Sequence, residues 1–401
     1  MQIVDDLGTV LATTPLYGTG QGSQIVFDSN TPATVLTSGL SIPSSVAIDG
    51  AGNAYVVDSA NSQVLKITPG GTPTPLLTAL ALPSGVAVDG TGDVFITNTG
   101  SGQITKITPA GVQTTISPAG LLSPTGIAAD GSGDLFVVDS GNNRAVEIRP
   151  SGVQTTLTSE LNQAFGIAVD AAGNVFIADT NNNRIVEVPF GKAQVVVPVS
   201  GLYLPSDVKV DAAGDLFIAD HGNSRVVEWS AAGVQTIVPT NGVSFPIGLA
   251  LDGAGDLFVT DDVANLAVEL PRSQPPAFHF VNTVAGTTSS DSPLSATVEN
   301  IGNQTLSAIA PGLSISKASG DTVFAQVAGT GTPADCIAAF SLAPGSNCNL
   351  SISFTATEGN VYRGSAVLTD NSLNANPATQ SILLTGLGTT VGTLLTLTIP
   401  E

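Results

Sequence analysis

Positive charge is scarce in this chain of 401 residues, which has 11 Lys and Arg against 32 Asp and Glu, a formal net charge of −21. Such a chain repels phosphates, which argues against nucleic acid or an anionic membrane as a partner. Histidine is scarcer still, with two residues in all, and tryptophan occurs once. The sequence contains no uninterrupted apolar run of about 18 residues, the length that a membrane-spanning helix needs.

The composition also disfavours helices. Only 11% of the residues are charged, whereas Gly occurs 44 times and Pro 25 times. This balance favours many short strands joined by turns. The length is sufficient for two domains, each with a substantial core.

Cysteine is limited to Cys336 and Cys348, twelve residues apart. One reading is a short disulfide in an exported protein, worth about 3 kcal/mol. The other reading is a pair of buried, reduced thiols. A zinc site is disfavoured because the nearest histidine, His279, lies 57 residues before Cys336 and further soft ligands are missing. The first twenty residues do not read as a signal peptide, so an exported setting is inferred from the cysteines and the composition.

Six copies of a repeat of about forty residues fill the first two-thirds of the chain, and the fourth copy reads FGIAVDAAGNVFIADTNNNRIVEV. Each copy contains an inner strand, a D-x-x-G-[DN] turn, a second strand, a D-x-x-N-x-R turn, a third strand and a weaker fourth strand. Four short strands per copy predict a propeller blade, so the predicted fold is all-β and begins with a six-bladed β-propeller. The first aspartates of the copies, at steps of 40, 41, 40, 41 and 41 residues, are Asp49, Asp89, Asp130, Asp170, Asp211 and Asp252.

Closure of the ring requires a strand from outside the six copies. The sixth copy ends at Leu270 without a fourth strand, and residues 33–37 precede the first copy without a blade of their own. We expect 33–37 to complete the sixth blade. Residues 24–28 compete for the neighbouring strand position, and the sequence leaves that choice open.

The repeat pattern resembles a known family. The pattern P-x-G-[IV]-A-[VL]-D-x-x-G-[DN]-x-[FY]-[VI]-x-D-x-x-N-x-R, seen best over residues 124–144, resembles NHL repeats. The resemblance covers roughly residues 24–271. It implies a β-propeller, often an extracytoplasmic sensor or binding module, although some relatives with similar propellers are lyases.

The repeat ends at a Pro-rich linker, residues 272–277, and strands and turns then alternate over 278–390, which predicts an Ig-like β-sandwich. The segments ENIGNQ and LAPGSNCNLSISF resemble bacterial Ig-like domains of the ciliary and surface-protein type. Residues 1–22 resemble the last hairpin of a truncated upstream domain of this kind. The propeller is then assigned to 23–271 and a C-terminal tail to 391–401, and we expect the chain to be part of a longer multidomain protein.

The repeated charged residues have two interpretations. The six first aspartates are expected to cap their own turns, and Arg144, Arg184 and Arg225 to brace neighbouring loops. A ring of carboxylates could instead hold Ca²⁺. Because the pattern recurs in nearly every copy, the structural interpretation is favoured, and no cofactor is predicted beyond the calcium alternative.

The fifth copy departs from the pattern. Lys209 replaces an inner-strand alanine, and Asp207 stands two residues earlier, so the two side chains share a face and can pair. The same copy carries His221, and Tyr203 enters it. We expect Tyr203, Asp207 and His221 on one face of the propeller, where with Lys209 they form a candidate ligand-binding site. The alternative is an internal ion pair beside a loop histidine.

The sequence thus predicts a non-catalytic binding or scaffold module of an exported bacterial surface protein. The propeller face would recognise a protein, peptide or glycan, at the cell surface or outside the cell. Catalysis is disfavoured because two histidines cannot supply a three-histidine metal site, and no G-x-S-x-G or phosphate-binding loop is present. The alternative function is a propeller lyase or hydrolase that uses His221 with Asp207, Lys209 and Asp220.

Overall fold

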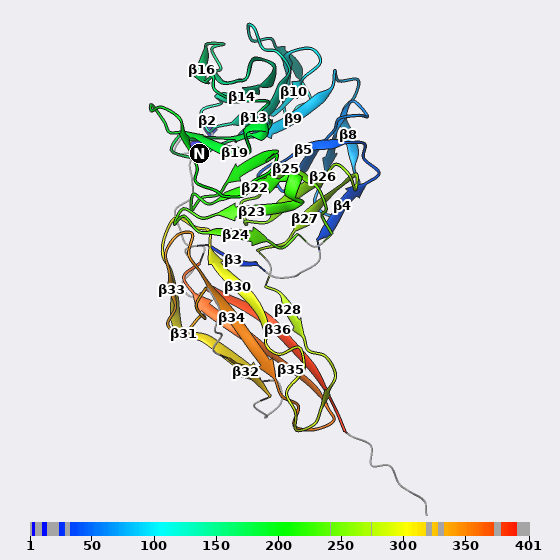
Figure 1. The fold of residues 1–401 in the computed structure, drawn as a ribbon, viewed down its shortest axis with the longest axis vertical. Coiled ribbons are helices and arrows are strands. Elements are labelled where there is room, and N and C mark those ends of the chain that lie inside the picture. The colour runs from blue at the N-terminus through cyan, green and yellow to red at the C-terminus, as the bar shows by residue number, and fades with distance from the viewer. Residues whose placement is uncertain are drawn as a thin grey trace, which may run out of the picture. The chain divides into compact units, whose positions relative to one another are not determined.

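A computed structural model describes residues 2–4, 10–13, 24–28, 33–240, 242–273, 275–317, 323–327, 333–372 and 378–390. The chain divides into two compact units (Figure 1), Met1–Gln21 with Asn30–Arg272 and Gly22–Ser29 with Ser273–Glu401. Both are built of strands, so the predicted all-β class is confirmed. The helices among the described residues are three 3₁₀ turns, η1 (Ser140–Asn142), η2 (Thr180–Asn182) and η3 (His221–Asn223). None of them is long enough to cross a membrane.

The first unit contains six four-stranded antiparallel sheets, which we number one to six. The strands of sheets one to three are β5 (Pro43–Ile48), β6 (Ala54–Asp58), β7 (Gln63–Ile67), β8 (Thr74–Leu77), β9 (Pro83–Val88), β10 (Val94–Asn98), β11 (Gln103–Ile107), β12 (Gln113–Ile116), β13 (Pro124–Ala129), β14 (Leu135–Asp139), β15 (Arg144–Ile148) and β16 (Gln154–Thr158). The strands of sheets four to six are β17 (Ile167–Val169), β18 (Val175–Asp179), β19 (Arg184–Val188), β20 (Val195–Val196), β21 (Asp207–Val210), β22 (Leu216–Asp220), β23 (Arg225–Trp229), β24 (Gln235–Val238), β25 (Pro246–Leu251), β26 (Leu257–Asp261), β27 (Leu266–Leu270) and β4 (Thr34–Ser38).

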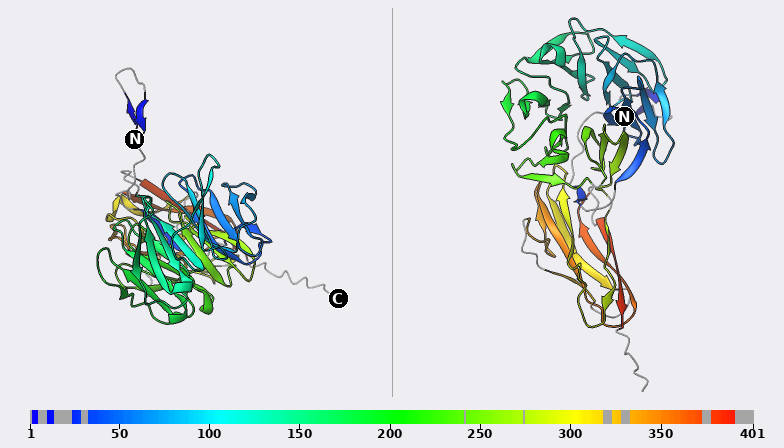
Figure 2. Two further views of the ribbon diagram at one scale, coloured as in Figure 1. Left: turned by 90° about the horizontal axis from the view of Figure 1, so that it is seen from above. Right: turned by 45° about the vertical axis from the view of Figure 1, so that its right-hand side comes forward.

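The first strands of the six sheets form a closed cycle. β5 contacts β9, β9 contacts β13, and the series continues through β17, β21 and β25 back to β5. Figure 2 shows the sheets placed around this ring. The apolar cores lie between neighbouring sheets, as where Val138 of sheet three packs with Ile167 and Ile177 of sheet four. The first unit is therefore a β-propeller.

The ring closes through a strand from the beginning of the chain. β4 pairs antiparallel with β27, with Leu266 opposite Ser38 and Ala267 opposite Thr37. The prediction that residues 33–37 complete the last sheet is confirmed. Residues 24–28 do not compete for this place, because β3 (Ile25–Asp28) pairs with β30 (Leu294–Asn300) in the second unit.

Close packing of the inner strands explains their glycines. A Cβ atom at Gly126 would overlap the carbonyl oxygen of Phe165 in the next sheet, and its N–H donates to that oxygen at 2.7 Å. Neighbouring inner strands thus approach backbone to backbone, which only glycine permits at this position.

A buried acid at the end of each second strand, except in sheet two, holds the loop that enters its sheet. In sheet four, Asp179 Oδ1 accepts from the backbone N–H of Asn162 at 2.7 Å, and Oδ2 accepts from Asn182 and Arg184. The carboxylate is fully buried. The bond from a backbone N–H of the entering loop recurs at Asp58, Asp139, Asp220 and Asp261, whereas sheet two has Asn98 there.

Asparagine side chains connect neighbouring sheets at the same end of the strands. Asn143 Oδ1 accepts from the N–H of Gln163, and Asn183 Oδ1 from the N–H of Leu204. Asn265 Oδ1 accepts from the N–H of Ile42 and so connects sheet six to sheet one. The loops that enter sheets one, four and five are thus fixed both by their own sheet and by the preceding one.

The second unit has two sheets. The smaller sheet has the order β3-β30-β34-β32, and the larger has the order β28-β36-β35-β31-β33, with β29 also paired to β36. The further strands of the second unit are β28 (Ala277–His279), β29 (Thr283–Val284), β31 (Leu306–Lys317), β32 (Phe324–Gln326), β33 (Ser341–Leu342), β34 (Asn347–Phe354), β35 (Val361–Asp370) and β36 (Ala378–Thr389).

One apolar core is shared by these two sheets. It includes Phe27, Leu350 and Phe354 from the smaller sheet and Leu368 and Leu384 from the larger. Burial of Phe27 in this core explains why the sequence boundary at residue 23 is wrong. The segment Gly22–Ser29 belongs to the second unit, although the propeller follows it directly in the chain.

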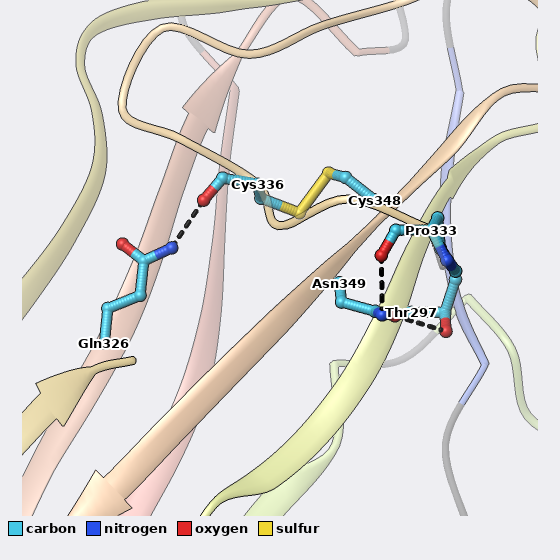
Figure 3. The surroundings of a disulfide bond; sticks show 6 residues. All are labelled: Thr297, Gln326, Pro333, Cys336, Cys348 and Asn349. Carbon is cyan, nitrogen blue, oxygen red and sulfur yellow. Dashed lines mark hydrogen bonds between the residues drawn. A yellow bond between two sulfur atoms is a disulfide. The ribbon is translucent and has the colours of Figure 1, made fainter. Parts of the chain in front are cut away.

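Cys336 and Cys348 form a disulfide in the second unit (Figure 3). Both are buried, and Cys348 lies on β34. Beside the bond, Asn349 Nδ2 donates to the carbonyl oxygen of Pro333 at 3.0 Å, and the side chain of Gln326 donates to the carbonyl oxygen of Cys336. The disulfide thus connects β34 to a segment without regular secondary structure.

The predictions for the two ends of the chain can be compared with the structure only in part. β1 (Gln2–Val4) pairs antiparallel with β2 (Val10–Thr13), so a hairpin lies within residues 1–22. Its origin in an upstream domain stays a prediction. The predicted tail, residues 391–401, lies outside the described residues.

The buried acids make a stability prediction. Asp179→Ala removes the acceptor of three hydrogen bonds and leaves Arg184 without its carboxylate, so we expect the free energy of unfolding to fall by roughly 2–4 kcal/mol. Urea unfolding followed by the fluorescence of Trp229, the one tryptophan of the chain, measures this in the propeller. Asn181→Ala, an exposed change in the same turn, is the control. An equal midpoint for the two variants would contradict the assigned role.

Candidate functional site

The two ends of the propeller strands differ in charge. At one end lie the loops that enter each sheet and the loops between its second and third strands. The charged or titratable residues in these loops are Glu160, Tyr203, His221 and Asp262. We call this end the neutral face. At the opposite end, the acidic face, the turns between first and second strands carry ten aspartates, and the turns between third and fourth strands carry Arg149 and Lys192.

The first aspartates of the repeat lie on the acidic face and cap their own turns. In every sheet, Oδ1 of this aspartate accepts from the backbone N–H groups two and four residues later. In sheet one these donors are Ala51 and Asn53, both at 2.9 Å from Asp49. The same pair of bonds is found at Asp89, Asp130, Asp170, Asp211 and Asp252.

Arg144, Arg184 and Arg225 lie at the edge of the neutral face. Each Nε donates to the buried carboxylate of its own sheet at 2.7 Å. Each Nη2 also donates to a backbone carbonyl oxygen of the loop that enters the sheet. The buried acid compensates each positive charge, so the three arginines act as loop braces.

Asp207 and Lys209 lie beside the centre of the ring and bind each other. Lys209 Nζ donates to both carboxylate oxygens of Asp207 at 2.8 Å and to the carbonyl oxygen of Val208 at 3.2 Å. Asp207 Oδ2 also accepts from the N–H of Leu249 in the next sheet at 2.8 Å. A cavity of about 10 Å³ adjoins this pair and is lined by Ser44, Ser84, Gly126 and Gly166 among others. It has room for about one water molecule.

His221 has a partner outside this ion pair. Its Nε2 is 3.3 Å from Oδ1 of Asp262 in sheet six, and its ring centroid is 5.8 Å from that of Phe245. Tyr203 packs against Gly222, the residue after His221. The side chains of His221 and Asp262 are 27% and 20% exposed, so solvent and small molecules can reach the pair.

The structure therefore separates the residues of the predicted site. Asp207 and Lys209 form an ion pair at the ring centre, and Asp220 is fully buried and bound to Tyr203 N–H, Asn223 and Arg225. Only His221 retains a polar partner that is accessible at the surface. The predicted cooperation of His221 with Asp207, Lys209 and Asp220 is thus not supported, because Asp207 and Lys209 bind each other and Asp220 is held by the loops of its own sheet and by Arg225.

Asp262 is the residue that sequence reasoning missed. It directly follows the buried acid of sheet six, at the position that His221 occupies in sheet five. In sheets one to four a hydroxyl residue stands there: Ser59, Thr99, Ser140 and Thr180. Two adjacent sheets therefore depart from the pattern at one position, and this signal was available in the repeat alignment.

A second group of acids lies on the acidic face of sheet five. Burial raises the pKa of Asp211 to about 8, with a further contribution from the Asp215 carboxylate. Burial also raises the pKa of Asp215. Glu228 is buried nearby and is 3.5 Å from a guanidinium nitrogen of Arg272, which stacks over Phe217 at 4.7 Å. One arginine thus faces three carboxyl groups.

Comparison with known proteins supports the repeat and the fold. The NHL repeat family matches residues 161–187 and 202–229. No curated protein matches the chain in sequence. A gluconolactonase from Xanthomonas campestris superposes with a TM-score of 0.54 and 18% identity, over 65% of this chain and 98% of its own. A streptogramin B lyase superposes with a TM-score of 0.48 and 12% identity, over 62% of this chain and 97% of its own. A luciferin-regenerating enzyme superposes with a TM-score of 0.46 and 14% identity, over 62% of this chain and 94% of its own.

The similarity to the gluconolactonase, at 18% identity, shows a shared fold. The prediction that the chain is not an enzyme is therefore wrong, because a protein named as a gluconolactonase shares its fold. Two histidines exclude only sites that need three histidines. They leave acid–base chemistry by a single imidazole available.

The raised pKa of Asp211 predicts a pH dependence. Because its folded-state pKa of about 8 lies above the ordinary value of 3.8, the folded state binds the proton more tightly, and the free energy of unfolding falls as the pH rises through this window. Asp211→Asn keeps the acceptor oxygen but cannot ionise. We expect it to flatten this slope and to raise the unfolding midpoint at pH 8 by roughly 2–4 °C.

Thermal unfolding between pH 5 and 9 measures this effect. The control is Asp170→Asn at the same turn position in sheet four, where the residue four places later is Asn174 and not a carboxylate. An Asp211→Asn protein with the same pH slope as the parent would contradict the assignment.

Proposed function

We propose that the propeller is an acid–base enzyme, a hydrolase or a lyase, that works on its neutral face with His221 as the proton-transferring residue. The observation that carries this proposal is the contact of 3.3 Å between His221 Nε2 and Asp262 Oδ1. Asp262 is a positioning residue, because it contacts the imidazole and not the reacting atoms.

The chemistry follows from the two ring nitrogens. A carboxylate at Nε2 favours the tautomer that carries hydrogen there, which leaves the Nδ1 lone pair as the proton acceptor. Nδ1 could then take a proton from a water molecule that attacks an ester, or from a carbon next to a carbonyl group in an elimination. The carboxylate also stabilises the imidazolium that forms.

Hydrolysis of a cyclic ester is the first reaction to test. One protein of this fold is named as a gluconolactonase, and fold similarity at 18% identity supports the choice of assay by analogy only. The proposal itself rests on the position of His221 and Asp262 in adjacent sheets.

We further propose the finer architecture on which this function depends. The six sheets are the blades of a six-bladed NHL-type propeller, and the second unit is an Ig-like spacer of an exported multidomain protein. The closed cycle of inner strands supports the first point, and the disulfide supports an oxidising location. Calcium binding by the acidic face stays a prediction, and no cofactor is established for the chain.

Replacement of the imidazole tests the function. We expect His221→Asn to lower kcat/KM for lactone or aryl ester hydrolysis by about 10²–10⁴-fold, and Asp262→Asn to lower it by a smaller factor. His279→Asn is the matched control, because His279 is the other histidine of the chain and lies in the second unit. Equal activity in the His221 and His279 variants would contradict the proposal, provided that both retain the thermal midpoint of the parent.

A further inference from the structure

The second unit is discontinuous in the sequence, and the propeller is inserted into it. Gly22–Ser29 and Ser273–Glu401 form the second unit, whereas Asn30–Arg272 between them belongs to the first. The insertion separates β3 in sequence from the other strands of its sheet. Residues 29–33 alone separate β3 from β4, the strand that closes the ring. A pull from the N-terminal side of the chain therefore meets β3 before it meets β4.

β3 is held in the second unit by pairing and by burial. It pairs antiparallel with β30 over four residues, beginning with Ile25 opposite Asn300. The N–H of Ile301 donates to the carbonyl oxygen of Gln24 at 3.0 Å and extends this ladder. Phe27 is 1% exposed and lies in the core between the two sheets of the unit. Detachment of β3 breaks the ladder and exposes an aromatic side chain, and both changes cost free energy.

The chain enters and leaves the second unit at opposite ends of its strands (Figure 1). β3 begins beside Asn300, next to the start of β34, because β30 pairs with both strands. β36 ends at Thr389, whose carbonyl oxygen accepts from the N–H of Ala285. The next N–H, that of Gly286, donates to Ala356, just beyond the end of β34. A pull on these two ends runs along the strands, so the pairs between β3 and β30 are loaded in shear, all at once.

The two ends of the propeller have a different arrangement. β4 begins at Thr34, which lies opposite Glu269, and β27 ends one residue later at Leu270. The pairing continues from there to Ser38 opposite Leu266. A pull on the two ends would separate the strands one pair at a time and peel β4 from β27. Peeling needs less force than shear, because a single pair resists at each step.

We propose that β3 is a strap that keeps tension away from the propeller. While β3 stays paired with β30, the propeller begins and ends in one folded unit, and a pull on the chain ends passes through the second unit alone. When β3 detaches, residues 29–33 transmit the pull to β4, and the ring opens between β4 and β27. The propeller thus keeps its fold, and any site that its loops form, up to the force that detaches β3. The inference depends on the chain topology and not on the proposed catalysis.

Stretching of single molecules of the full chain in two geometries tests the strap. One geometry has handles on both chain ends, and in the other a handle on Thr34→Cys, an exposed position, replaces the N-terminal handle and bypasses β3. We expect the propeller to open in a step of about 800 Å, the contour length of residues 34–270. The force of this step should fall to roughly half or less in the second geometry, because one pair instead of four resists. Equal forces in the two geometries would overturn the proposal.

Two variants test the parts of the device separately. Phe27→Ala weakens the attachment of β3, so we expect it to lower the force of the propeller step in the first geometry and to leave the second geometry unchanged. Ser38→Cys with Leu266→Cys places two thiols opposite each other on β4 and β27, where a disulfide locks the ring. We expect this lock to abolish the propeller step, whereas Ser38→Cys alone retains it. An unchanged force in Phe27→Ala, or a locked ring that still opens, would also overturn the proposal.

Discussion

The buried carboxylates at the ends of the second strands are the interaction on which the propeller depends. Each of them accepts hydrogen bonds from the loop that enters its sheet, and in sheets three to five each also binds an arginine. These contacts fix the loops of the neutral face and remove the acids from its surface. The buried polar atoms at the strand ends therefore fix the loops from which His221 and Asp262 reach the surface.

The same residue type has a different role at the other end of the strands. The first aspartates cap tight turns on the acidic face. In sheet five the carboxyl groups of Asp211, Asp215 and Glu228 lie together there, and burial raises the pKa of Asp211 and Asp215. Most copies of the repeat thus place a buried acid at one end of their strands, and every copy places a turn-capping aspartate at the other end. Function is expected where copies depart from this common plan, and the departure that remains accessible to solvent is the pair His221 and Asp262.

Much of the fold could be predicted because the repeat fixes strand order, turn chemistry and ring closure by β4. The position of β3 could not be predicted, because the sequence of a single strand does not indicate which sheet it will join. In the structure β3 joins the second unit and buries Phe27 in its core. The candidate site was predicted in part. Lys209 and Asp207 were correctly paired, but His221 was assigned to its own sheet. In a ring, the nearest polar partner of a loop residue can belong to the next sheet, as Asp262 does.

The central claim is that the neutral face, and not the ring centre or the second unit, meets the ligand. The two histidines of the chain report on it directly, since His221 lies on this face and His279 in the second unit. Carbon-13 NMR of the two imidazole Cε1 groups during titration with an uncharged aryl ester or lactone is the most direct measurement. The account predicts a saturable shift of the His221 signal with the His279 signal unchanged. A compound that binds or is turned over while the His221 signal stays constant would contradict it.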